Sequence, residues 1–223
     1  MLEVMDLLNI ERLAITSTLA CYNDCPRGNA EVEQVLKRYP DRFLGYVTVN
    51  PNPIGQALQQ LEKYSHFHHP PLIKMHPTCH HYPANGPNYL PVWDYANQTQ
   101  AVVLVHTWDS DSQCGPLLFG PIARAFPHAR ILLGHAGVTW RGYEQALEVA
   151  EKHPNLLLDI AGSHSHRTII EHCVGKIGAE RVLFGSDLPF LEAAMSLGRV
   201  LTARIPHVNK ELILRTNFLR LIS

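Results

Sequence analysis

Residues 101–107, AVVLVHT, place five apolar positions directly before a histidine and a threonine. A run this apolar, without alternation between polar and apolar residues, is typical of a strand that is buried on both faces. Strands of this kind occur in parallel sheets that are covered by helices. His106 stands where this strand ends, so it is either a hydrogen-bonded core histidine or a residue that binds metal or moves protons.

Similar apolar runs recur along the chain, and each is bounded by turn residues. The runs that we predict as strands are residues 12–18, 42–49, 72–77, 101–107, 130–137, 155–162 and 181–189. Segments with helical spacing lie between them, such as residues 30–40, 54–64, 143–153 and 168–178. The ends of the predicted strands recur every 25 to 32 residues. One strand, one helix and two short loops fit this period, which predicts a (β/α) barrel or a doubly wound sheet.

Polar residues at the ends of successive strands favour the barrel. No glycine-rich dinucleotide motif follows any of the runs, whereas polar side chains follow four of them: Lys74 and His76, His106, His135, and Asp187. In a closed barrel these ends meet around one mouth. Residues two apart share a face of a strand, so we expect Ile131, Leu133 and His135 to face inward together. We predict an α/β fold, a TIM-like (β/α) barrel with seven of eight strands evident, as a single domain over residues 1–223.

Composition excludes several other classes of protein. The formal net charge is −1 and no basic stripe is present, which argues against a nucleic-acid partner. No apolar run approaches the roughly 20 residues that cross a bilayer, and the N-terminal segment lacks the features of a secretory signal. The five cysteines are scattered and odd in number, which favours a reducing compartment. We expect a cytoplasmic protein that acts on a small molecule.

Three segments carry a resemblance to a known family: VLVHTW (103–108), ILLGHAG (131–137) and RVLFGSDLPF (181–190). Taken in this order, they resemble the amidohydrolase superfamily, in particular the amidohydrolase-related branch that includes aminocarboxymuconate-semialdehyde decarboxylase. The resemblance implies that His106, His135 and Asp187 bind a divalent metal, and that Asp187 also contacts the catalytic water. Lys74 and His76, in IKMHP (73–77), match a strand-four segment of many relatives.

One part of the family pattern is missing from this sequence. The family opens with a strand that carries an HxH pair of metal ligands, and residues 12–18 correspond to the second family strand. A late start, a fragment and a divergent, catalytically impaired barrel all fit this difference. The HxH spelling in SHSH (163–166) follows the seventh strand, and we interpret it as a solvated loop. We therefore expect the metal, with zinc as the first choice, to be weakly bound, partly occupied or absent.

The missing strand also bears on assembly. A barrel that lacks one strand leaves two unpaired strand edges, which have to be covered. We expect the N-terminal segment, a C-terminal element or a neighbouring subunit to cover this gap, and we predict a homo-oligomer.

The candidate residues together suit hydrolysis. A divalent metal lowers the pKa of bound water from 15.7 to roughly 7, Asp187 can accept the proton of that water, and His135 can polarise the substrate carbonyl or protonate the leaving group. We predict a metal-dependent hydrolase that acts on an amide, ester or lactone bond of a small polar substrate. The alternatives are a non-oxidative decarboxylase of the same family and an impaired barrel that only binds a ligand or partner.

The remaining candidate residues are considered for contact with the substrate. Lys74 has three interpretations: a carbamylated lysine that bridges two metals, a cation for a substrate carboxylate, and a lysine paired with an acid such as Asp187. An inward ammonium group needs some partner, because burying it alone is costly. His76 and Trp108 are predicted to line the substrate pocket, whereas we expect His80 to be solvated and Asp159 to be structural.

Overall fold

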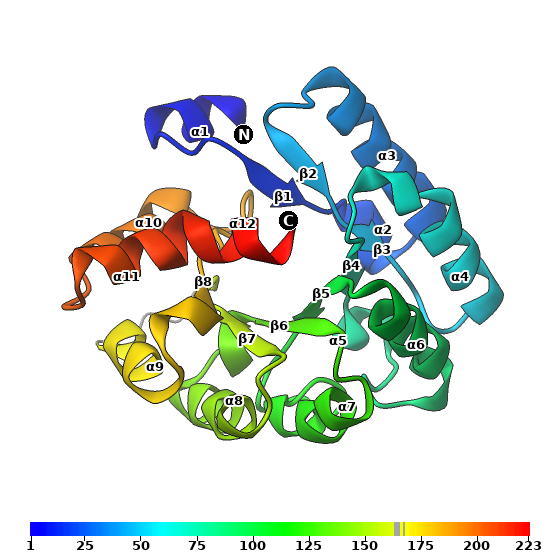
Figure 1. Cartoon of the computed structure of the whole chain (residues 1–223). Coiled ribbons are helices and arrows are strands. Elements are labelled where there is room, and N and C mark those ends of the chain that lie inside the picture. The colour runs from blue at the N-terminus through cyan, green and yellow to red at the C-terminus, as the bar shows by residue number, and fades with distance from the viewer. Residues whose placement is uncertain (163–165, 167) are drawn as a thin grey trace.

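Parallel strands make up the centre of the molecule. A computed structural model describes residues 1–162, 166 and 168–223. The strands are β1 (Leu13–Ile15), β2 (Phe43–Gly45), β3 (Val47–Thr48), β4 (Leu72–Met75), β5 (Val102–His106), β6 (Arg130–Gly134), β7 (Leu156–Asp159) and β8 (Val182–Leu183). All pairings are parallel. β1 pairs with β2 in one sheet, and β3 to β8 pair in chain order in a second sheet. Figure 1 shows these strands as an arc with helices around its outer side.

The strands correspond to the seven predicted runs. β2 and β3 lie in the single run 42–49 and are separated only by Tyr46, whose N–H donates to Ile15 of β1. The run therefore pairs with β1 in its first half and with β4 in its second half. The predicted parallel α/β architecture is confirmed, and the observed strands are shorter than the predicted ones.

Helices connect the strands and cover the outer face of the arc. The α-helices are α1 (Leu2–Leu7), α2 (Thr18–Tyr22), α3 (Cys25–Arg38), α4 (Ile54–Lys63), α5 (Pro77–His80), α6 (Leu90–Thr99), α7 (Phe119–Ala125), α8 (Trp140–Lys152), α9 (Ile169–Ile177), α10 (Ala193–Thr202), α11 (His207–Glu211) and α12 (Asn217–Leu221). Short 3-10 turns are η1 (Ser65–Phe67), η2 (Pro87–Tyr89), η3 (Pro116–Leu118), η4 (His135–Gly137) and η5 (Ala179–Arg181), and η6 (Leu212–Thr216) is a π-helical turn. No helix in the described ranges is long and apolar enough to span a bilayer.

Local capping explains where the longer helices begin. The Asp24 side chain accepts a hydrogen bond from the Arg27 N–H at the start of α3, and Thr139 does the same for the Gly142 N–H at the start of α8. Such caps satisfy backbone donors that have no partner inside the helix. α9 ends at Gly178, which has a φ of 81° that glycine adopts without steric cost.

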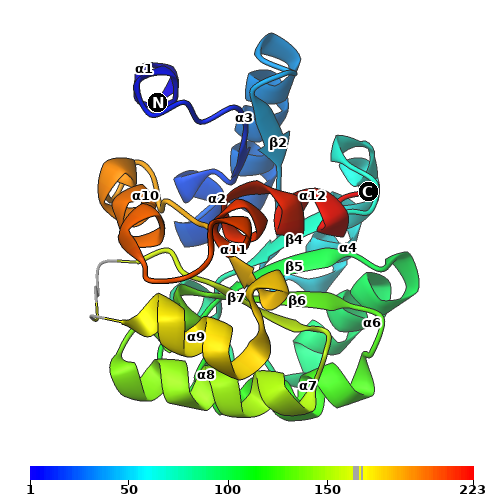
Figure 2. The same cartoon turned by 60° about the vertical axis from the view of Figure 1, so that its left-hand side comes forward.

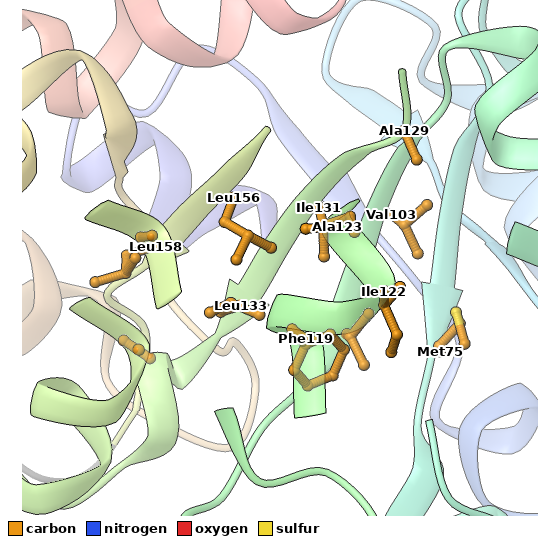
Figure 3. Close-up of a cluster of buried hydrophobic side chains, with 14 of the residues drawn as sticks. Met75, Val103, Phe119, Ile122, Ala123, Ala129, Ile131, Leu133, Leu156 and Leu158 are labelled. Carbon is orange, nitrogen blue, oxygen red and sulfur yellow. The ribbon is translucent and has the colours of Figure 1, made fainter. Parts of the chain in front are cut away.

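Both faces of the strands are buried, as the apolar runs predict. The outer face packs against the helices, and Figure 3 shows one part of this outer core, where side chains from β4 to β7 meet Phe119, Ile122 and Ala123 of α7. The inner face forms a second, smaller core, made by Leu44, Tyr46, Leu72, Val102, Leu132, Leu157, Leu183 and Ile222. Burial on both sides leaves the carboxyl ends of the strands as the place where polar side chains can lie without disrupting either core.

The prediction that Ile131 and Leu133 of β6 face inward is wrong, because the alternate residues of the strand face inward instead. Ile131 and Leu133 lie in the outer core, and Leu132 lies in the inner core. Strand alternation alone would therefore point His135 outward. The backbone leaves the extended conformation at this point, since His135 has a φ of 65°.

The arc is open between β1 and β8, because no ladder joins these two strands in the described part of the chain. C-terminal elements lie beside this gap (Figures 1 and 2). Ile213 accepts a hydrogen bond from the Phe184 N–H next to β8, and Arg215 forms an ion pair with Glu11 of the N-terminal segment. Ile222 reaches the inner core. Part of the exposed edge is thus covered within the chain, and the homo-oligomer stays a prediction.

Candidate active site

A cavity of about 770 Å³ opens at the carboxyl ends of the strands and continues along the gap between β1 and β8. Five of the predicted site residues line it: Lys74, His76, His106, His135 and Asp187. They come from β4, β5, the turn after β6 and the loop after β8. Trp108 is not among the lining residues; it lies at the rim, half-exposed, with its ring centroid 6.4 Å from that of His106.

Three imidazole rings lie against one another in this cavity. His76 and His106 are stacked, with ring centroids 4.2 Å apart and planes 13° apart, and the His135 ring centroid is 4.9 Å from that of His106. Burial, followed by the nearby Lys74 cation, lowers the pKa of His76 to about 3. Burial, followed by His76, lowers the pKa of His106 to about 2. Both rings are therefore neutral at physiological pH. His76 Nδ1 accepts a hydrogen bond from the Cys79 N–H at 3.4 Å.

Lys74 brings a positive charge into the same cavity. Its side chain is only 7% exposed, and within the described residues no carboxylate lies at ion-pair distance from it. The pairing with Asp187 that the sequence left open is therefore not formed. A ligand carboxylate at this position would compensate the cost of burying the ammonium group.

Asp159, which we predicted to be structural, also lines the cavity. It ends β7, and its Oδ1 accepts a hydrogen bond from the Ala161 N–H at 2.8 Å. Burial raises the pKa of the Asp159 carboxyl, and nearby His135 and then Lys74 oppose this effect. A Cβ at Gly185 would lie 2.4 Å from Asp159 Oδ2, so only glycine at that position leaves room for the carboxyl. Asp159 lies inside the predicted run 155–162, whereas the observed strand β7 ends at this residue.

Two of the predicted metal ligands have unusual backbone conformations. His135 has a φ of 65° and Asp187 a φ of 59°, both in the left-handed region that residues other than glycine rarely adopt. Asp187 begins a turn in which its carbonyl accepts the N–H of Phe190 at 2.9 Å. Such outliers persist where the surrounding structure holds them, and they cluster at functional sites.

Two other histidine predictions have different outcomes. His80 was expected to be solvated, but it is 5% exposed, its Nδ1 lies 3.2 Å from the Tyr89 hydroxyl, and burial lowers its pKa to about 4. It is a core histidine, because α5 turns the loop after β4 back onto the barrel. Residues 163–165 of the HxH-like segment lie outside the described residues, and the His166 ring lies edge-on to Trp140.

The side chains in the cavity are of the types that bind a divalent metal, but their arrangement fits a metal site only in part. His135 Nδ1 is buried and has no hydrogen-bond partner among the described residues, and the neutral ring of His106 offers a further nitrogen donor. Such nitrogen donors, with a carboxylate such as Asp187, suit zinc and similar ions. Within the described residues, however, no group of three histidine, cysteine, aspartate or glutamate side chains is arranged to hold a metal ion.

Comparison with known families now gives the family of the chain. The model of the Amidohydrolase family matches residues 13–222, which is nearly the whole sequence. The chain belongs to this family. A search of curated proteins finds no match.

Solved structures with similar folds are TIM-barrel proteins and decarboxylases. An uncharacterized TIM-barrel protein from Bordetella bronchiseptica is 20% identical, with a TM-score of 0.81 over 99% of this chain and 80% of its own. A 2,6-dihydroxybenzoate decarboxylase from Rhizobium is 17% identical, with a TM-score of 0.77 over 99% and 86% of the two chains. A 5-carboxyvanillate decarboxylase from Novosphingobium aromaticivorans, complexed with manganese and 4-hydroxy-3-methoxy-5-nitrobenzoic acid, is 16% identical, with a TM-score of 0.79 over 99% and 78%. At these identities the likeness establishes the TIM-barrel fold.

We predict weak metal binding. Because no group of three ligand side chains among the described residues is arranged to hold a metal ion, the protein purified without chelator should contain well below one equivalent of zinc or manganese by elemental analysis. Dialysis against Mn²⁺ should raise this content, and His106→Gln should reduce the uptake. Glu211→Gln, at an exposed position on α11, serves as the control. A full equivalent of tightly held metal in the untreated protein would contradict the prediction.

Acid should destabilise the fold through His76 and His106. Their pKa values in the folded state lie below the ordinary value of about 6.5, so the unfolded chain takes up these protons more readily. Their contribution to stability is complete above pH 6.5 and is lost as the pH falls toward their folded-state values. Each histidine should lower the free energy of unfolding by up to about 1.4 kcal/mol per pH unit in that window.

Urea titrations at pH 7 and pH 5 measure this effect. The loss of stability between the two pH values should be smaller in His106→Gln than in the unmodified chain, whereas His128→Gln, at an exposed position, should leave the loss unchanged. Equal losses in all three proteins would show that His106 is not buried in its neutral form.

Proposed function

We propose that this chain is a metal-dependent, non-oxidative decarboxylase of a small planar carboxylic acid, such as a hydroxybenzoate. The observation that carries the proposal is Lys74, a buried cation with no carboxylate at ion-pair distance among the described residues, in a cavity that imidazole and carboxyl groups also line. A substrate carboxylate would supply the missing partner at ion-pair distance. The decarboxylases of similar fold, which are named for aromatic acids, support the same choice.

The residues of the chain account for the binding part of the reaction. Lys74 pairs with the carboxylate of the substrate, and the apolar side chains of Leu104, Leu132 and Leu183 exclude water from the lower part of the cavity. Loss of water strengthens the contact between the two charges. A divalent metal held by His106, His135 and Asp187 would add Lewis acidity toward the substrate oxygens.

His135 and Asp159 supply the proton that decarboxylation requires. When the bond to the carboxyl carbon breaks, its electron pair stays on the remaining carbon, carbon dioxide leaves, and that carbon takes up one proton. His135 lies at the cavity surface, and the Asp159 carboxyl is close enough to affect it electrostatically. The raised pKa of Asp159 keeps a proton available in this pair, which suits a general acid.

A hydrolase is the second candidate, and the position of Asp187 favours it. Asp187 lies in the same cavity as His135, so the two can act as base and acid on an amide, ester or lactone bond. This chemistry depends on an activated water at the metal, and the described residues supply only part of a metal site. An impaired barrel that only binds a carboxylic acid is the third possible outcome of the test below.

The test measures release of carbon dioxide from 2,6-dihydroxybenzoate and 5-carboxyvanillate by the chain loaded with Mn²⁺ or Zn²⁺, with hydrolysis of a simple lactone assayed in parallel. We expect carbon dioxide release, and a loss of about 10- to 100-fold in kcat/KM in Lys74→Met, since a hydrogen bond to a charged group contributes about 1.5–3 kcal/mol. Lys37→Met, on the exposed side of α3, is the matched control and should keep full activity.

Each other outcome is also informative. Lactone cleavage without carbon dioxide release would favour the hydrolase. Binding of the acids to the unmodified chain but not to Lys74→Met, without turnover, would identify an impaired barrel. Turnover that is unaffected by Lys74→Met would refute the assignment of Lys74 as the carboxylate site.

A further inference from the structure

The turn after β6 carries His135 into the cavity, although strand alternation would point this residue outward. Four consecutive residues in this turn have positive φ: His135 at 65°, Ala136 at 46°, Gly137 at 82° and Val138 at 71°. Only glycine adopts such values freely, and each of the other residues is strained in this conformation. A turn with three such residues persists only if neighbouring groups hold it in place.

One buried hydroxyl holds both ends of this turn. Thr107 Oγ1 accepts a hydrogen bond from the Gly137 N–H at 2.9 Å and donates one to the Gly134 carbonyl at 2.7 Å. The Thr107 N–H also donates to the Gly134 carbonyl, at 3.1 Å. Thr107 is 0% exposed, so water cannot replace these contacts. The hydroxyl therefore connects the residue before His135 with the residue two positions after it.

A second set of contacts holds Gly137 through its carbonyl group. The N–H groups of Asp109 and Thr139 both donate to the Gly137 carbonyl, at 3.2 and 2.9 Å. The Thr139 hydroxyl donates to Asp109 Oδ2 at 2.8 Å, which joins the loop after β5 to the start of α8. A Cβ at Gly142 would lie 2.0 Å from the Gly137 carbonyl oxygen, so the helix and the turn are in direct contact.

We propose that Thr107 is a positioning residue for His135, because its hydroxyl holds the left-handed turn that keeps the imidazole in the cavity beside His106. Strand alternation directs His106 and Thr107 of one segment to opposite sides. His106 enters the cavity itself, and Thr107 places the second ring by fixing the neighbouring turn. The effect of this positioning on turnover rests on the proposed function, whereas its effect on the His135 ring does not.

The test compares Thr107→Val, which removes the hydroxyl at nearly constant volume, with Thr107→Ser, which keeps it. Side-chain NMR signals of His135, assigned by their loss in His135→Gln, should shift in Thr107→Val and stay in place in Thr107→Ser. Thr48→Val is the matched control: Thr48 is equally buried and its hydroxyl lies 2.6 Å from that of Thr16, with no hydrogen bond to the His135 turn. It should leave the His135 signals unchanged.

Turnover gives the second readout. In the carbon dioxide assay, Thr107→Val should lower kcat by about 10- to 100-fold, since small misplacements of a reacting group cost that much, with KM changed by less than about threefold. Thr107→Ser should restore kcat. If Thr107→Val does not fold, Asp109→Ala, which loosens only the second set of contacts, should give a smaller shift of the His135 signals.

The outcomes separate this inference from the proposed function. Unchanged His135 signals in folded Thr107→Val, or in Asp109→Ala where that variant replaces it, would overturn the positioning role. A shift that Thr107→Ser reverses, in a protein that releases no carbon dioxide in any form, would support the positioning role and refute the proposed function. A shift of equal size in Thr48→Val would show that the effect is a general loss of packing and would also overturn the proposal.

Discussion

The parallel register of the central strands is the constraint on which the site depends. Lys74 of β4 lies opposite Leu104 of β5, and His106 at the end of β5 lies opposite Gly134 of β6. This register sets the carboxyl ends of three neighbouring strands at the same level, so one cavity receives side chains that are far apart along the chain. A slip of one residue in any pair would exchange the inward and outward rows and send the lysine or the histidine into the outer core.

Burial then determines the chemical state of these groups. The cavity removes water from His76 and His106, and the lysine and the neighbouring imidazoles make a positive charge on either ring still less favourable. The same burial favours the protonated form of Asp159. The site thus combines neutral imidazole rings, a carboxyl that retains its proton more strongly, and the buried lysine.

The sheet is open between β1 and β8, and the described residues include no group of three side chains arranged to hold a metal ion. In a closed barrel, each strand contributes to the mouth, and a gap removes the contribution of one strand. Here the C-terminal helix lies beside β8, and Ile222 of the segment that follows it closes part of the inner core, which protects apolar surface but adds no metal donor. An apolar residue can thus complete the core at this edge without contributing a metal ligand.

The sequence by itself determined the order and type of the elements. The seven apolar runs became strands, Gly178 ended a helix, and Lys74, His76 and His106 reached the cavity by simple alternation. These features depend on local propensity and on burial of whole strands, both of which are visible in the residue pattern. The sequence also indicated polar groups at the strand ends, and so the location of the candidate site.

The tertiary structure alone decided how His135, Asp159 and His80 are used. His135 enters the cavity through a left-handed turn that is hydrogen-bonded to the hydroxyl of Thr107, just after β5, and Asp159 fits because residue 185 lacks a side chain. His80 is buried because α5 folds back onto the barrel, where Tyr89 meets its ring. In each case the deciding contact joins residues that are distant in sequence, and such contacts leave no mark in the periodicity of a single segment.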